Sequence, residues 1–223
     1  MKKIGLALSG GGIRAYAHLG VLSNLDWAKI PISLISGSSV GAIIGAYYSA
    51  GLNLDVLKNR LKEIGFFDIL SPIFPFYGLS NFKKIANLFS KMGIPENFED
   101  LKIPLIVTAT DLKKRVPVYF NSGSLWSALF ASMALPAFFS PIKMGDMYLV
   151  DGGITNNLPV SVLKENGADY IVAVDVNSSS RKFPKITNIY QVVYESVTLM
   201  VQRTTEQERM VADYVIDINL EGV

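Results

Sequence analysis

A chain of 223 residues is long enough to bury a substantial core, and we expect residues 1–223 to form a single domain. Hydrophobic residues make up 50% of the chain and charged residues 18%, a balance typical of a buried α/β sheet and not of a disordered or coiled chain. The net charge of +2 gives no argument for a nucleic-acid partner, the absence of cysteine excludes a thiolate nucleophile, and a single histidine argues against a histidine-rich zinc site.

Two long stretches without charged residues, 30–54 and 116–142, raise the question of membrane spans. Glycines, prolines and polar residues interrupt both, so neither is the uniform apolar run of about 20 residues that a spanning helix needs. Near the start, the apolar run 4–8 is too short for the hydrophobic region of a signal peptide. We therefore expect buried strands and helices, and a cytoplasmic protein.

Short β-branched runs alternate with amphipathic stretches, which is typical of a mostly parallel sheet covered by helices on both faces. The runs predict strands at residues 3–8, 32–35, 104–109, 116–120, 147–150, 170–176 and 214–218. The first helix is expected to end near residue 27, and further helices are predicted at 40–50, 54–64, 81–92, 124–134 and 187–212. Asn53 and Ser80 are predicted N-caps. The predicted fold class is α/β, with three layers in the order α/β/α.

The segment 37–41 has the pattern G-x-S-x-G, with Ser39 at its centre. A β-branched run leads into it and a helical stretch of small residues leads out, which is the strand–turn–helix context of a nucleophile elbow. Gly37 and Gly41 leave room for a tight turn from which the hydroxyl of Ser39 protrudes beside a helix N-terminus. The pattern therefore predicts a nucleophilic serine.

A glycine-rich segment follows the first strand, and two interpretations compete for it. Gly10, Gly12 and Ala15 formally satisfy a dinucleotide fingerprint, but the second strand does not end in the acidic residue that would hold a ribose hydroxyl. In the other interpretation, the N–H groups of Gly10, Gly11 and Gly12 stabilise the oxyanion of an ester-hydrolysis intermediate beside the elbow. Arg14 would then steady this loop or bind an anionic group, or would pair with a structural acid.

A serine nucleophile needs a base, and the chain's only histidine, His18, precedes Ser39, so the order serine, acid, histidine is impossible. His18 lies among small and apolar residues and is expected to be a packed histidine. The base is then a carboxylate. Asp151 stands where a short strand meets Gly152 and Gly153, the presentation expected of a site residue at a sheet edge, although it could instead cap this turn. Weaker candidates are an aspartate in a solvated turn and two at strand ends without a glycine turn, namely Asp146, Asp111 and Asp175.

Three separated blocks, in this order, resemble the patatin-like phospholipases, a family of lipid acyl hydrolases with a Ser–Asp dyad. Residues 10–14 resemble the oxyanion loop of that family, 37–41 its nucleophile elbow, and 151–153 the turn that carries its catalytic aspartate. Ser9 and Ala15 depart from the aspartate and glycine of many members. Neither replaces a group that would touch the reacting carbonyl, so the resemblance keeps both the fold and the dyad.

The resemblance covers residues 4–176 closely, and the compact chain resembles a small member of bacterial type. Three further stretches also fit the family: 110–112, 131–136 and 156–159. The resemblance implies that Asp151 takes the proton of Ser39 as the hydroxyl attacks an acyl ester, and that water then hydrolyses an acyl-enzyme. It implies activity of the phospholipase A, lysophospholipase or carboxylesterase type on lipid acyl esters, without a cofactor.

An aromatic, proline-broken segment at 66–77 is predicted either as a flap that lines an acyl groove or touches a bilayer surface transiently, or as a core-packed connection. The basic clusters 113–115 and 181–182 are interpreted as solvated loops. A catalytically silent domain that keeps the fold and binds lipid is the alternative function. The oligomeric state is left without a prediction.

Overall fold

The computed structural model describes residues 2–63, 78–136, 138–178 and 187–218. Its strands are β1 (Ile4–Leu8), β2 (Ile32–Ser38), β3 (Leu105–Asp111), β4 (Val116–Phe120), β5 (Ile142–Met144), β6 (Met147–Asp151), β7 (Tyr170–Asp175) and β8 (Tyr214–Asp217). Its helices are α1 (Tyr16–Trp27), α2 (Val40–Ser49), α3 (Leu54–Glu63), α5 (Gly78–Met92), α6 (Leu125–Ser132), α7 (Ser161–Glu165) and α8 (Ile189–Arg209). Short 3₁₀ turns lie at Gly12–Ala15, Phe98–Asp100 and Gly152–Ile154.

The strands form one mixed sheet in the order β5-β6-β3-β2-β1-β7-β8, and β4 pairs with β3 beside this path. β1 pairs in parallel with β2 and β7, while β2 continues in parallel to β3 and β7 to β8. The pairs that involve β4, β5 and β6 are antiparallel. The mostly parallel sheet is confirmed, and β1 and β2 are neighbours in it. The carboxyl ends of β1, β2 and β7 consequently meet at one edge, where sites form in such sheets.

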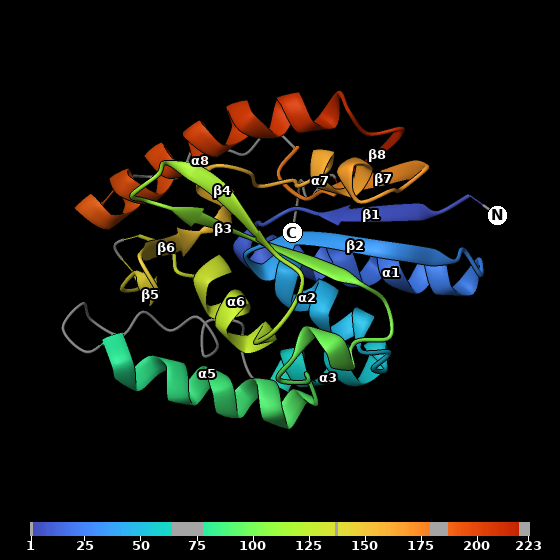
Figure 1. The fold of residues 1–223 in the computed structure, drawn as a ribbon, viewed down its shortest axis with the longest axis horizontal. Coiled ribbons are helices and arrows are strands. Elements are labelled where there is room, and N and C mark those ends of the chain that lie inside the picture. The colour runs from blue at the N-terminus through green and yellow to red at the C-terminus, as the bar shows by residue number, and fades with distance from the viewer. Residues whose placement is uncertain (1, 64–77, 137, 179–186, 219–223) are drawn as a thin grey trace.

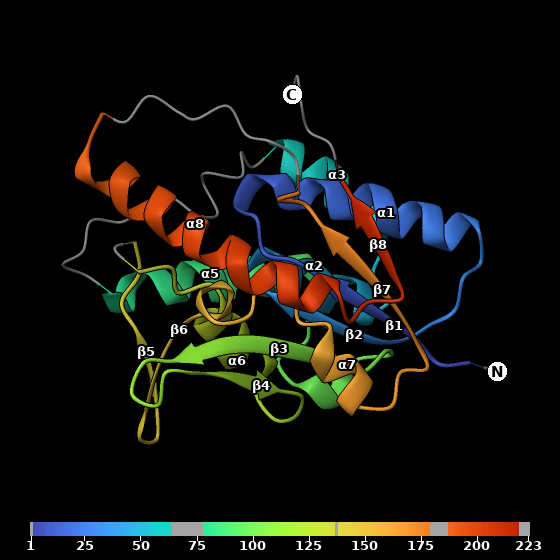
Figure 2. The same ribbon diagram turned by 90° about the horizontal axis from the view of Figure 1, so that it is seen from above.

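Helices cover both faces of the sheet, as Figure 1 shows. α7 and α8 lie on one face, and α1, α2 and α6 lie on the other, with α3 and α5 outside them. Seen from above, α8 runs obliquely across the sheet and leads into β8 (Figure 2). This arrangement is the predicted three-layer α/β/α fold.

The core lies in two layers, one on each face of the sheet. The larger apolar cluster fills the space between the sheet and α1, α2 and α6, and includes Leu6, Leu8, Ile35, Leu125 and Leu129. A smaller cluster packs α7 onto the opposite face and consists of Ala7, Leu158, Val160, Leu163, Ile171 and Ala173. β3 is buried along its whole length, as expected of a strand covered on both faces. The loops at the carboxyl edge therefore project from a rigid, well-packed support.

Several predicted boundaries differ from the structure for local reasons. Asn53 caps α3 as predicted, since its Oδ1 accepts the N–H of Asp55 at 2.8 Å. The Ser80 cap is wrong because α5 already begins at Gly78 and Ser80 lies inside the helix. β2 extends to Ser38, so the strand runs directly into the elbow, and the short β5 and α7 have no counterpart among the predicted elements.

The segment 66–77, predicted as either a flap or a core connection, lies outside the described residues, as does the basic cluster 181–182. Within the part of the chain that the structure describes, none of the helices combines the length and the apolar character that crossing a bilayer requires.

Candidate active site

Ser39 is the single residue between β2 and α2, and its backbone has a positive φ of 52° with ψ of −127°. A non-glycine residue in such a conformation costs on the order of 1–3 kcal/mol, and the surrounding structure must hold it there. At Gly37 and Gly41 the backbone passes so close to neighbouring backbone atoms that no side chain would fit, and this makes the tight turn possible. A Cβ on Gly37 would lie 2.7 Å from Ala42 N, and one on Gly41 would lie 2.5 Å from Leu8 O. The local geometry is thus that of the predicted elbow.

Asp151 ends β6, and its side chain meets Ser39. The Ser39 hydroxyl donates a hydrogen bond to Asp151 Oδ2 at 2.7 Å, across 112 positions of sequence. The other carboxylate oxygen, Oδ1, accepts the N–H of Gly153 at 2.8 Å. A Cβ on Gly152 would overlap the carbonyl oxygen of Thr108, so the turn after Asp151 lies directly against β3. The structure therefore brings the two predicted side chains into contact.

The last residue of α6 and the segment after this helix fix both partners through their backbones. Ser132 Oγ accepts the N–H of Ser39 at 2.8 Å, and the carbonyl of Ala134 accepts the N–H of Asp151 at 3.0 Å. Thr110 Oγ1 donates to the carbonyl of Asp151 at 2.9 Å. Sequence reasoning noticed the stretch 131–136 only through the family resemblance. Its positioning role depends on an antiparallel β6 that the sequence did not reveal.

Burial sets the acidity of Asp151. The residue is 6% exposed, and this burial raises the pKa of its carboxyl to about 6, because a charge is poorly solvated there. The hydrogen bonds from Ser39 and from the Gly153 N–H act in the opposite direction, since both stabilise the carboxylate. A carboxylate with a pKa this close to neutrality is a better proton acceptor than an exposed aspartate.

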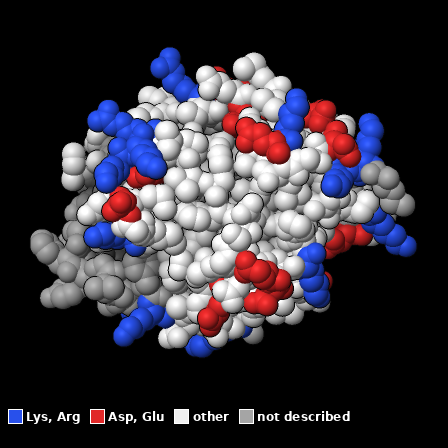
Figure 3. All heavy atoms as spheres, viewed as in Figure 1, with Lys and Arg blue, Asp and Glu red and all other residues white. Residues whose placement is uncertain are grey.

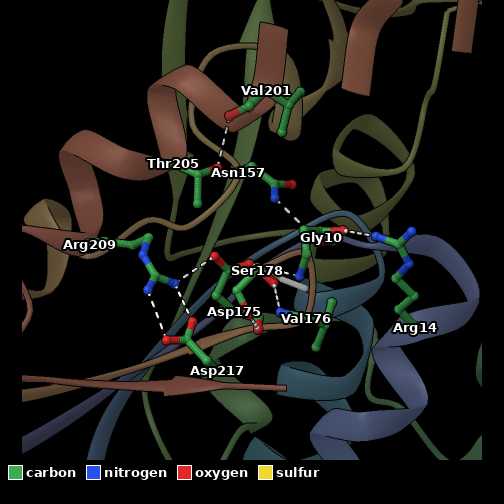
Figure 4. A network of polar contacts seen from close by, with 12 residues as sticks. Gly10, Arg14, Asn157, Asp175, Val176, Ser178, Val201, Thr205, Arg209 and Asp217 are labelled. Atoms are coloured by element: carbon green, nitrogen blue, oxygen red, sulfur yellow. Dashed lines mark hydrogen bonds and ion pairs between the residues drawn. The ribbon is translucent and has the colours of Figure 1, made fainter. Parts of the chain in front are cut away.

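The glycine loop lies beside Ser39 and is held by its own peptide groups. A Cβ on Gly10 would lie 3.1 Å from Ser39 Cβ, which places the loop against the elbow. The Gly10 carbonyl accepts two side-chain amides, from Asn157 Nδ2 at 3.3 Å and from Asn177 Nδ2 at 2.6 Å. The Gly10 N–H donates to the carbonyl of Asn157 at 3.1 Å. Figure 4 shows Gly10 with Asn157 on one side and Arg14 on the other.

These contacts separate the three predicted oxyanion glycines. The N–H of Gly10 is already taken, whereas the N–H groups of Gly11 and Gly12 donate to no acceptor within the described residues. Arg14 Nη1 donates to Asn177 Oδ1 at 3.3 Å, so Asn177 contacts both the loop carbonyl and the arginine. Within the described residues, the two amides that follow Gly10 in the loop thus remain without an acceptor.

The C-terminal end of α8 supports the segments that carry both asparagines, and Figure 4 shows its Arg209 beside Asp175 and Asp217. Arg209 pairs with Asp175 at 2.9 Å, and Asp175 Oδ1 accepts the N–H of Asn177 at 2.9 Å. Glu208 Oε2 accepts the backbone N–H groups of Val160 and Ser161, just after Asn157. Asn157 lies in the stretch 156–159, which was noted only through the family resemblance, and no sequence feature had pointed to Asn177. Their placement requires knowing that β7 lies next to β1.

His18 is fully buried and packed inside the molecule, as expected. Its Nε2 lies 2.8 Å from the carbonyl oxygen of Ser9, and burial lowers the pKa of its imidazole to about 4. The ring is therefore neutral near pH 7. Among the described residues, no group of three or more acidic, histidine or cysteine side chains is placed to hold a metal ion.

The weaker aspartate candidates all lie elsewhere. Asp146 is exposed in the β5–β6 turn. Asp111 is buried and accepts the N–H of Lys113 at 2.9 Å, and Asp175 is engaged by Arg209. Of the carboxylates weighed from the sequence, Asp151 is the one whose side chain bonds to Ser39.

Similarity to known proteins identifies the family of the chain. The family model for patatin-like phospholipases matches residues 6–164. This chain belongs to the patatin-like phospholipase family. The lysophospholipase NTE1 of Scheffersomyces stipitis is 32% identical over 190 residues, which cover 81% of the chain but 12% of that protein. The neuropathy target esterase sws of Drosophila melanogaster is 34% identical over 188 residues, which cover 78% of the chain and 13% of that protein.

Among solved structures, this patatin-like phospholipase chain is similar to VipD from Legionella pneumophila. The TM-score is 0.52 and the sequence identity 16%, with 87% of this chain and 52% of VipD covered. The likeness concerns the fold. The resemblance stated from the three sequence blocks is confirmed, and the region matched by the patatin-like phospholipase model contains Ser39 and Asp151 but ends before Asn177.

Proposed function

We propose that the chain is a serine acyl hydrolase that cleaves lipid acyl esters through Ser39 and Asp151. The observation that carries this proposal is the 2.7 Å hydrogen bond from the Ser39 hydroxyl to a buried Asp151 whose pKa is raised to about 6. A nucleophile in direct contact with a base of this strength can be activated without a histidine. The proposal describes this chain alone, because the named relatives are much longer proteins.

In the first half of the reaction, Ser39 Oγ bonds to the acyl carbon while its proton moves to Asp151 Oδ2. We assign the developing oxyanion to the N–H groups of Gly11 and Gly12, which follow Gly10 in the loop and have no acceptor among the described residues. Such preorganised donors are worth several kcal/mol because they need no reorientation in the transition state. The proton held by Asp151 then passes to the departing alcohol oxygen, which leaves the acyl-enzyme.

In the second half, a water molecule takes the place of the alcohol. Asp151 accepts one proton from this water as its oxygen attacks the acyl carbon, and the same glycine amides stabilise the second oxyanion. When the intermediate collapses, the bond to Ser39 Oγ breaks and the proton returns from Asp151 to Ser39. The fatty acid leaves and both side chains regain their starting state.

The substrate class follows from the family and from the relatives. Relatives described as a lysophospholipase and as a neuropathy target esterase match this chain over about the same region. We therefore propose a lysophospholipid or a related single-chain acyl ester as the substrate. The cytoplasmic location of the chain and its transient contact with a membrane surface remain predictions from the sequence.

A fluorophosphonate probe tests the proposal directly. The probe should label Ser39 in the wild-type protein, as read by mass spectrometry of the labelled peptide, and the same protein should release fatty acid from lysophosphatidylcholine. Ser39→Ala should lose both properties. The matched control is Ser38→Ala, because the neighbouring Ser38 hydroxyl is buried and has no hydrogen-bond partner in the described structure.

An unlabelled protein that still binds lysophosphatidylcholine would instead support the silent lipid-binding alternative. Labelling at a serine other than Ser39 would overturn the assignment of the nucleophile.

Asn177 provides a second test, since it holds the peptide group that carries the Gly11 N–H. The two amides on the Gly10 carbonyl fix the Gly10–Gly11 peptide plane, and thereby aim the N–H at its other end. Removing the shorter of these bonds with Asn177→Ala should lower kcat by roughly 10- to 100-fold, less than the loss of an oxyanion donor itself. Because the contact matters in the transition state, KM for p-nitrophenyl butyrate should stay nearly constant.

Asn177→Asp separates this role from that of Arg14. The carboxylate can still accept from Arg14, but it has no N–H to donate to the Gly10 carbonyl and would repel it. We expect kcat to fall at least as far as in Asn177→Ala. An Asn177→Asp variant with wild-type kcat would refute the positioning role.

A further inference from the structure

The β3–β4 turn gathers cationic side chains at one end of the molecule. Lys113, Lys114 and Arg115 are all exposed, and Lys143 on β5 is exposed nearby. None of the four forms an ion pair within the described residues. Figure 3 shows lysine and arginine side chains clustered at the end where Figure 1 places this turn. Asp146, in the turn between β5 and β6, is an exposed acid beside these four cations, and the five side chains together carry an excess of positive charge.

Apolar side chains lie between these cations. Lys143 pairs with Tyr148 across β5 and β6, and the Tyr148 carbonyl accepts the N–H of Leu112 at 2.9 Å. Directly paired residues share a face of the sheet, so these three form one outward row. Tyr148 is 48% exposed and Leu112 46%, and Val116 adds a further exposed apolar side chain across the turn. We call the seven residues the hairpin tip: Leu112, Lys113, Lys114, Arg115, Val116, Lys143 and Tyr148.

Buried residues hold the hairpin tip in place. Asp111 is fully buried, and its Oδ1 accepts the N–H of Lys113 at 2.9 Å while its carbonyl accepts the N–H of Arg115 at 2.7 Å. Leu149, which pairs with Asp111, is also fully buried. The tip therefore presents its cations and apolar groups from a fixed support.

The hairpin tip projects from the same edge of the sheet as the nucleophile. Ser38, which precedes Ser39, pairs with Thr108 on β3, and β3 continues in the same direction to Asp111. Those further residues extend the strand by about 10 Å. A flat surface that touches the tip would therefore face the edge that carries Ser39 and Asp151.

We infer that the hairpin tip is a docking surface for anionic phospholipid bilayers. Four cations without an ion pair among the described residues fit a negatively charged surface, and the exposed leucine and tyrosine side chains of the row fit the apolar boundary below the headgroups. A nucleic-acid backbone would match the cations but would leave the apolar row without a partner. The orientation toward Ser39 rests on the proposed function, in which the substrate is a lipid, whereas the docking itself does not require catalysis.

Co-sedimentation with vesicles tests the docking, and the Ser39→Ala background keeps the lipids intact. The protein should bind vesicles of phosphatidylcholine and phosphatidylserine more tightly than vesicles of phosphatidylcholine alone. Each cation near an anionic surface contributes about fivefold to partition, so Lys113→Gln/Lys114→Gln/Arg115→Gln should weaken binding to the anionic vesicles roughly 100-fold. Leu112→Ser/Tyr148→Ser should weaken it as well, since it removes the apolar contact.

The matched control removes the same charge from the opposite edge of the sheet. Lys29, Lys102 and Lys164 are exposed and precede β2, β3 and β7, so they lie toward the amino ends of the strands. Lys29→Gln/Lys102→Gln/Lys164→Gln should bind anionic vesicles nearly as the parent does. All variants, restored to Ser39, should hydrolyse soluble p-nitrophenyl butyrate at parental rates if the parent does, which separates docking from the proposed chemistry.

Two results would overturn the inference. One is an equal loss of vesicle binding in the tip variant and in the control, because that would indicate the effect of net charge alone. The other is binding of a DNA duplex that matches vesicle binding and survives Leu112→Ser/Tyr148→Ser, because the tip would then be a general polyanion site.

Discussion

Replacing Asp151 with asparagine should lower kcat for ester hydrolysis by at least about 10⁴-fold while the protein stays folded. The amide has the shape of the carboxylate and can still accept the N–H of Gly153, so the turn after β6 should persist. It cannot take the proton of Ser39, and His18, the chain's only histidine, is buried and bonded to Ser9. Steady-state kinetics with p-nitrophenyl butyrate measures the loss. The control is Asp146→Asn, which neutralises an exposed aspartate and should retain parental kcat.

The pH dependence of the wild-type hydrolysis rate is a second test of the role of Asp151. Asp151 must be ionised to act as a base, and burial raises the pKa of its carboxyl to about 6. The rate should therefore rise with pH through about 6 and then level off. A profile that rises instead near pH 4, where exposed aspartates titrate, would contradict a buried base.

Asp151→Asn should also make the fold more stable at neutral pH. A folded-state pKa raised above the unfolded value stabilises the protein below the unfolded pKa, and this stability is lost as pH rises through the folded pKa. At pH 7 the buried carboxylate consequently costs on the order of 3 kcal/mol. Chemical denaturation of both proteins at pH 7 measures the difference. Lower stability in the variant would indicate that Asp151 is a structural cap rather than a strained functional group.

Gly41→Ala should destabilise the fold by about 3 kcal/mol or more and abolish the elbow geometry. Its Cβ would lie 2.5 Å from the carbonyl oxygens of both Leu8 and Ser9, and backbone atoms in the centre of a sheet cannot move aside cheaply. Either α2 shifts away from β1 or the segment around Ser39 distorts. The free energy of unfolding and labelling by a fluorophosphonate should fall together.

Gly20→Ala is the matched control for this substitution. Gly20 lies inside α1, is exposed, and a Cβ there would meet nothing within 4 Å. Because alanine favours the helix, this variant should be more stable than the parent by about 0.5–1 kcal/mol. Comparable destabilisation by the two substitutions would show that the loss at Gly41 has no steric origin.

The sequence predicts those parts of the site that depend on local order. The elbow at Ser39 needs a strand, a tight turn and a helix in succession, and all three leave patterns within about fifteen residues. Asp151 could be singled out because a short strand meets two glycines there. In the structure, Ser39 Oγ lies 2.7 Å from Asp151 Oδ2, so the two predicted residues are in contact.

The residues that position this pair could not be found in the same way. Ser132 touches Ser39 because α6 packs against β3 and β6, and Asn177 reaches Gly10 because β7 pairs with β1. Neither contact leaves a local pattern, since each depends on the order of strands in the sheet. The hairpin tip, too, could be predicted only in part from the sequence. Its cations are visible in the sequence, but the row of Lys143, Tyr148 and Leu112 appears only with the antiparallel register.

The two side-chain amides that donate to the Gly10 carbonyl determine how far the chain can be shortened from its C-terminus without loss of support for the glycine loop. A truncation at residue 164, where the family match stops, would keep Ser39, Asp151 and Asn157. It would delete Asn177 together with β7, which pairs with β1 along its whole length. Boundaries for expression or for grafting this domain should therefore extend past Arg209 and Asp217, whose ion pair ties the last strand to α8.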